Sequence, residues 1–146
     1  MGRWNDTYQK SLPHKISACI DIHCEIQAVP FKQLSEMQPG EPSAAIRERV
    51  IAARKIQEER FKPFKGIHCN AMMTERMLHE FAEPDEQSLD MLRMAMERLK
   101  LSARAYTRIL KVARTIADLA GEAAILPAHL VEAAGYRFLD RRRLVD

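Results

Sequence analysis

The chain has 146 residues, of which 47% are hydrophobic and 29% are charged, figures that are typical of one globular domain with a hydrophobic core. This composition excludes a disordered chain, and the length excludes a scaffold that depends on disulfides or metal to fold. No stretch reaches the roughly 20 consecutive apolar residues of a membrane span, so we expect no membrane contact. A formal charge of +3 is too small to indicate a nucleic-acid-binding protein by itself.

The first ten residues are polar and lack the apolar centre of a signal peptide. The three cysteines, Cys19, Cys24 and Cys69, are odd in number and indicate free thiols in a reducing compartment. Both observations favour a cytoplasmic protein. Few glycines and only 6% aromatic residues, beside many Ala, Leu, Arg and Glu, favour an all-α fold.

The N-terminal part of the chain differs from the rest. Apolar and polar residues alternate over residues 20–29, which predicts one half-buried β-strand. A single strand leaves its backbone unpaired, so we expect it to be a remnant of a larger sheet. Residues 30–42 contain three prolines and a glycine and are typical of a linker. We therefore divide the chain into residues 1–42, a partly disordered remnant, and residues 43–146, a helical domain.

Five helices are predicted in the second part, each starting at a residue that favours a helix N-terminus. These starts are Ser43, Thr74, Asp85, Ser102 and Pro127. The first helix is expected to reach about Phe61, and the fourth to close at Gly121. In the first helix the i, i+4, i+7 stripe is Ile46, Val50, Ala53 and Gln57. In the fifth, the side chains expected to face inward are Leu130, Val131, Ala134 and Phe138. Short loops between the five helices predict a compact bundle.

The fourth helix separates cationic from apolar side chains. Arg104, Arg108 and Lys111 share one face, and Ile109 and Ala113 lie on the opposite one. The simpler interpretation of the basic face is ordinary solvated charge. The functional interpretation is a phosphate site, because Arg104 lies in the first turn, where backbone N–H groups favour anions.

The sequence lacks the motifs of a self-sufficient enzyme. It contains no G-x-x-x-x-G-K-[ST] phosphate loop and no G-x-S-x-G elbow, so we expect no catalytic residues in this chain alone. The positions of His68, Cys69 and His79 match no standard zinc spacing, and we expect no metal site.

The run Leu101–Leu119 closely resembles the C-terminal helical domain of the magnesium chelatase-like AAA+ ATPases, in their ComM/YifB competence group. Ser43–Gln57 is similar to the first helix of that domain, and His129–Arg137 is similar to its last helix. Ile20–Val29 resembles the end of the preceding AAA+ core, so residues 1–42 would be a remnant of that core.

This resemblance implies a ring-forming ATPase in which a helical lid covers ATP and Mg²⁺ held by the core domain. The family's sensor-2 arginine falls on Arg104, with Arg108 and Lys111 as a supporting basic face. The implied partners are the AAA+ core domain and neighbouring subunits, and the group's link to natural transformation implies DNA as the ultimate substrate. No ATPase activity is expected from this chain alone.

One segment departs from the family pattern. Before the Ile20 segment, relatives usually carry Gly-Pro-Leu-Leu-Asp-Arg, whose arginine reaches a neighbouring subunit's nucleotide, whereas this chain reads His14-Lys-Ile-Ser-Ala-Cys19. A thiol has neither the charge nor the five donors of a guanidinium. Either this ring lacks that arginine, or Lys15 or Arg3 replaces it.

Two other functions compete with the lid. One is a stand-alone DNA-binding module that uses Arg104, Arg108, Lys111 and the tail Arg141–Arg143, with salt-sensitive phosphate contacts. The other is a protein-interaction domain whose 8 Met side chains adapt to a partner. A DNA module is expected to bind duplex at low salt without help, whereas a lid gains function only beside its core.

Overall fold

A computed structural model of the chain describes residues 20–24, 26–31, 40–99 and 101–137. Five α-helices and one short 3₁₀ helix follow one another there, and no strand forms among these residues. The elements are α4 (Ser43–Phe61), η1 (Asn70–Met72), α5 (Glu75–Phe81), α6 (Glu86–Leu99), α7 (Ala103–Ala120) and α8 (Pro127–Gly135). The predicted all-α fold is confirmed.

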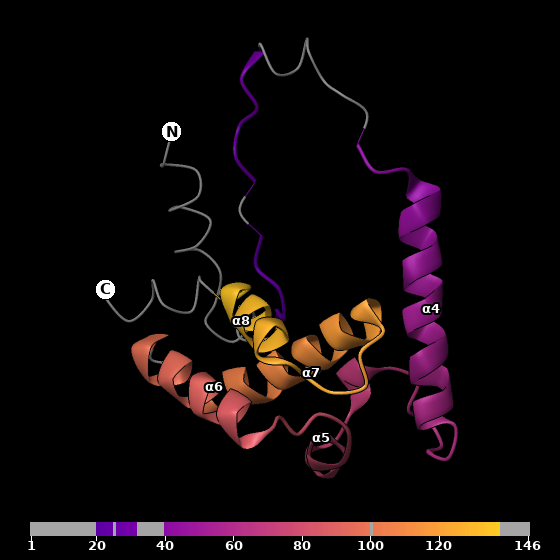
Figure 1. Cartoon of the computed structure of the whole chain (residues 1–146), viewed down its shortest axis with the longest axis vertical. Helices are drawn as coiled ribbons and strands as arrows, with labels where there is room; N and C mark the ends of the chain where they lie inside the picture. The colour runs from indigo at the N-terminus through magenta and orange to yellow at the C-terminus, as the bar shows by residue number, and fades with distance from the viewer. Residues whose placement is uncertain (1–19, 25, 32–39, 100, 138–146) are drawn as a thin grey trace.

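Helix α7 runs through the middle of the bundle and contacts α4, α5, α8 and η1, while α6 packs on α8 (Figure 1). Its apolar face is fully enclosed, since Ile109 and Ala113 have no exposed surface. Buried apolar side chains from other parts of the same core include Phe61, Met77, Leu78, Leu92 and Leu130. The orientation of α7 is therefore set by the whole core rather than by one neighbour.

Local hydrogen bonds begin and end the helices largely where the sequence predicts. The side chain of Thr74 accepts from the N–H of Met77 at 3.4 Å, and that of Ser102 accepts from the N–H of Ala105 at 3.3 Å. Gly121 ends α7 in the left-handed conformation, with φ +74°. The predicted cap at Ser43 is wrong: Ser43 is the first helical residue, and the preceding residue, a proline, occupies the cap position without a side-chain bond.

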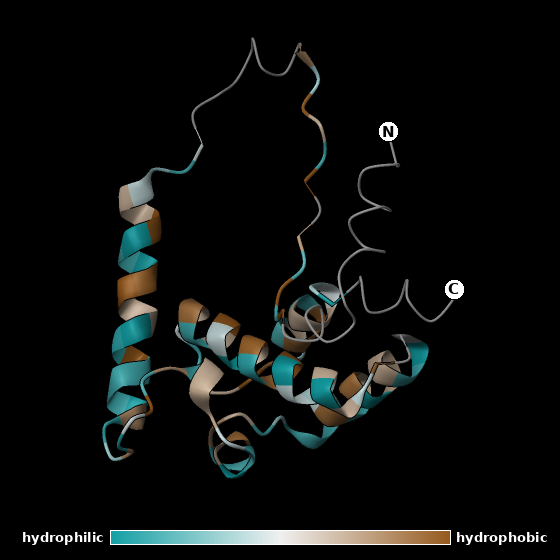
Figure 2. Ribbon diagram, turned by 180° about the vertical axis from the view of Figure 1, so that it is seen from behind, coloured by the Kyte–Doolittle hydropathy of each residue, from teal (hydrophilic) through white to brown (hydrophobic). Residues whose placement is uncertain are grey.

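Two predicted apolar stripes are only partly buried. In α4, Ala53 and Gln57 are buried, but Ile46 and Val50 are 42% and 41% exposed, because the N-terminal half of the helix projects beyond α7 (Figure 2). In α8, the prediction that Val131 faces inward is wrong, since it is 60% exposed. The side chain of Val131 is turned by about 100° from that of the buried Leu130 around the axis of α8, and the buried side of this helix is narrow. Phe138 lies outside the described residues.

The described residues between 20 and 31 do not form the predicted strand. They lead away from the bundle beside α8 (Figure 1), and Ile26 there is 92% exposed. A strand requires a neighbour for its backbone hydrogen bonds, and no described segment supplies one.

None of the helices in the described ranges combines the length and the apolarity that a bilayer span needs.

Candidate functional site

Arg104 lies in the first turn of α7, directly after the cap formed by Ser102. Its side chain is exposed and makes no hydrogen bond or ion pair with any other described residue. The first-turn N–H groups have no acceptor within their own helix, except where Ser102 supplies one to Ala105. The guanidinium and the positive end of the helix dipole thus stand together at a solvent-facing position, an arrangement that attracts an anion.

The other two cations of the predicted face are engaged. Arg108, whose side chain is 22% exposed, forms an ion pair with Asp21. The Nζ of Lys111 donates to the backbone carbonyl of Ala71 in η1 at 2.8 Å. The structure therefore brings the three predicted residues onto one helix face but leaves Arg104 as the one of the three without a described contact.

A buried polar cluster at the other end of α7 was not predicted from the sequence. Both carboxylate oxygens of Asp118 accept from Arg60 of α4, at 2.5 and 2.7 Å, and one of them also accepts from Nε of Arg114 at 3.1 Å. Asn70 of η1 donates to the same carboxylate at 2.8 Å and accepts from Arg60 at 2.8 Å. We call these four residues the Asp118 cluster. It joins α4, η1 and α7.

The Asp118 cluster is buried and sets two guanidinium groups against one carboxylate. The side chain of Asp118 has no exposed surface, and that of Arg114 is 3% exposed. Burial alone raises the pKa of Asp118, but hydrogen bonds from Arg60 and Asn70, together with the two guanidinium charges, hold it below its usual value. Arg114 also donates to the carbonyls of Ala123 and Glu122, at 2.7 and 2.6 Å, and so fixes the loop after α7.

The sequence carries one faint signal for this cluster. Arg114 and Asp118 are spaced i, i+4 on α7, a spacing that predicts an ion pair between them but not its burial. Arg60 lies 58 residues from its partner, and no local pattern connects the two.

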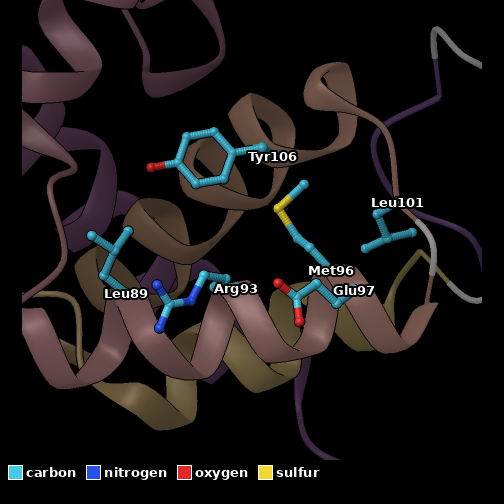
Figure 3. A pocket seen from close by; sticks show the side chains of 6 residues that line it. All are labelled: Leu89, Arg93, Met96, Glu97, Leu101 and Tyr106. Carbon is cyan, nitrogen blue, oxygen red and sulfur yellow. The ribbon is translucent and has the colours of Figure 1, made fainter.

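A shallow pocket of about 480 Å³ opens between α6 and the start of α7. Figure 3 shows Tyr106 of α7 across the pocket from Leu89 and Arg93 of α6. Tyr106 is turned by about 200° from Arg104 around the helix axis. The pocket and the exposed arginine therefore lie on different sides of α7.

Metal-binding side chains do not gather in the described part of the chain, where no three His, Cys, Asp or Glu residues are close enough to share an ion. His79 is instead 3.8 Å from Glu83, one turn further along the chain. Cys24 and Cys69 are free thiols.

Comparison with known proteins places the chain in a family. Residues 40–137 match the family model described as magnesium chelatase, subunit ChlI C-terminal. The chain is 34% identical over 152 residues to competence protein ComM of Haemophilus influenzae, a match that covers 96% of this chain and 29% of ComM. It is 38% identical over 122 residues to the uncharacterized protein YifB of Escherichia coli, covering 83% of this chain and 23% of YifB.

An uncharacterized protein of Mycobacterium tuberculosis is 33% identical over 104 residues, covering 71% of this chain and 20% of that protein. The chain thus spans less than a third of the length of these curated relatives. The matched range begins three residues before α4 and ends just after α8, so it contains the whole bundle described above. The chain belongs to the family of magnesium chelatase ChlI C-terminal domains, which it shares with ComM and YifB.

Proposed function

We propose that this chain is the nucleotide-sensing helical lid of a magnesium chelatase-like AAA+ ATPase, and that Arg104 contacts the terminal phosphate of ATP. The observation that carries the proposal is the state of the three cations on α7. Arg108 and Lys111 are held by partners within the chain, whereas Arg104 is exposed and uncommitted beside the positive end of its helix.

The scaffold suits an arginine that must reach a phosphate in a defined geometry. A guanidinium stabilises phosphoryl transfer only when it is held where negative charge develops, so its helix has to be fixed in advance. Helix α7 meets this requirement through the enclosed Ile109 and Ala113 at its middle and through the Asp118 cluster at its far end. In this proposal the AAA+ core domain holds ATP and Mg²⁺, and the lid completes the site.

The wider biological role follows by analogy with one relative. ComM is named a competence protein, and we propose that the ATPase containing this lid works in the cytoplasm, as a ring of subunits, on DNA. A stand-alone DNA-binding surface is less well supported, because Asp21 and a backbone carbonyl engage two of the three cations that it would use. The tail Arg141–Arg143 lies outside the described residues.

The test is Arg104→Ala in the full-length ATPase. We expect hydrolysis to fall about 10³-fold, the lower end of what an arginine at a transferring phosphoryl group contributes. Arg93→Ala is the matched control, because it removes another exposed arginine, one on α6 that pairs with Asp90 among the described residues. The 146-residue chain alone is expected to show no hydrolysis.

Two outcomes would overturn the proposal. Full activity in Arg104→Ala would remove the sensor role. If that variant kept its ATPase activity but lost duplex DNA binding at low salt, α7 would instead be a nucleic-acid surface.

A further inference from the structure

Residues 20–23 are attached to the helical bundle, although the sequence places them with the preceding domain. The N–H of His23 donates to the carbonyl of Tyr136 at 2.9 Å, and the side chain of Arg137 donates to the carbonyl of Ile20. His23 is only 6% exposed. Asp21 adds the ion pair to Arg108 on α7. We call residues 20–23 the strap.

These contacts of the strap involve two separate parts of the bundle. Tyr136 and Arg137 directly follow α8, whereas Arg108 lies on the second turn of α7, one turn beyond Arg104. Asp21 and Arg108 are 87 residues apart in sequence. The strap therefore crosses from the C-terminal end of α8 to the face of α7 that carries the proposed sensor.

The strap gives the bundle a second attachment to the chain that precedes it. The first attachment is α4, which is joined to α7 through the Asp118 cluster. Beyond the strap, Ile26 and Phe31 are 92% and 84% exposed, so these two described residues do not pack on the bundle. Any rotation of α7 must then either carry residues 20–23 with it or break the ion pair.

We propose that the strap positions α7, with Asp21 and Arg108 as the positioning pair. Arg108 then acts through Asp21 and does not itself contact the phosphate. The part of this inference that concerns ATP rests on the proposed function above. The docking of the strap is a separate claim that can be measured without nucleotide.

Amide hydrogen exchange on the 146-residue chain tests the docking. The His23 amide is expected to exchange more slowly than those of residues 26–29, because it donates to Tyr136. Asp21→Arg reverses one charge of a partly exposed ion pair, and we expect it to speed exchange across residues 20–24 about fivefold. Adding Arg108→Glu restores opposite charges and is expected to recover most of the protection.

The matched control is Asp90→Arg, which makes the same charge change in the exposed Asp90–Arg93 pair of α6. This variant is expected to leave exchange in residues 20–24 unchanged. Equal exchange in the wild type and Asp21→Arg would overturn the docking. So would a double variant that exchanges as fast as the single one.

The ATPase assay then separates docking from positioning. In the full-length protein, Asp21→Arg is expected to raise the KM for ATP by up to about fivefold, because the competent placement of α7 is less populated. The double variant is expected to recover most of the loss. Faster exchange with an unchanged KM would overturn positioning and leave docking intact. Full ATPase activity of Arg104→Ala would instead refute the proposed function alone, because Arg104 would then have no role in hydrolysis.

Discussion

Replacing Asp118 by alanine should destabilise the bundle more than any surface substitution. The change would leave two guanidinium groups in the core without their carboxylate, and breaking a buried ion pair in this way costs about 3–5 kcal/mol. We expect the lower value, about 3 kcal/mol, for two reasons. The side chain of Arg60 is 13% exposed and can reach water, and Arg114 keeps its bonds to two backbone carbonyls. For a chain of this length the midpoint of thermal unfolding should fall by about 10 °C.

The Asp118 carboxylate also makes the free energy of unfolding depend on pH. The pKa of Asp118 in the folded chain is held below its usual value of about 4, because hydrogen bonds from Arg60 and Asn70 and the charges of Arg60 and Arg114 outweigh the effect of burial. The unfolded chain therefore binds this proton more readily, so the stabilisation is complete above about pH 5 and is lost as the pH falls below about 4. In Asp118→Ala this part of the acid sensitivity should disappear.

Urea unfolding of the wild type and the variant at pH 7 and pH 3.5 measures both effects. Asp90→Ala is the matched control, since it removes a carboxylate whose side chain is 58% exposed from an ion pair with Arg93, and it should change the free energy of unfolding by less than about 0.5 kcal/mol. If the free energy of unfolding of Asp118→Ala lies within about 1 kcal/mol of the wild-type value, as judged against that control, the Asp118 cluster does not hold α4 to α7.

Other substitutions test the local signals and the exposed arginine. Ser102→Ala should cost about 1 kcal/mol in unfolding free energy, because it removes the cap of α7. Gly121→Ala should lower the free energy of unfolding by about 1 kcal/mol, because φ is +74° there, although the added methyl group has open space. Gly135→Ala in α8 should instead raise the free energy of unfolding by about 0.5 kcal/mol. Equal effects of the two substitutions would contradict this explanation from backbone conformation. Arg104→Ala should change stability by no more than about 0.5 kcal/mol in a thermal melt, and a larger loss would make it a structural residue.

The parts of the fold that depend on neighbouring residues were predictable. Thr74, Ser102 and Gly121 act within one helical turn of themselves, and the structure places each as predicted. The Asp118 cluster was missed because Arg60 and Asp118 meet only after α4 and α7 have packed. For the same reason the contacts of residues 20–23 with the bundle were not predicted, since their partners lie beyond residue 107.

For the candidate site, periodicity correctly grouped Arg104, Arg108 and Lys111 on one face of a helix. It could not rank the three, because the partners of Arg108 and Lys111 come from the strap and from η1. The first-turn position and the family resemblance singled out Arg104, but which of the three cations has no partner within the described chain is decided by tertiary structure.

The N-terminal half of α4, which projects beyond α7, has a consequence for how unfolding is observed. Its first turn carries no acidic residue and no side-chain cap, and the residues buried in this helix begin only at Ala53, so the helicity of the first two turns rests on backbone propensity, which is marginal in water for so short a segment. These turns should melt gradually at temperatures where the core around Ile109 is still intact. Circular dichroism at 222 nm would then begin to fall before the near-ultraviolet signal of Tyr106, which is partly enclosed between α6 and α7. A single midpoint fitted to helix content alone would mix the two processes, so the stability of the bundle is better measured from its aromatic side chains.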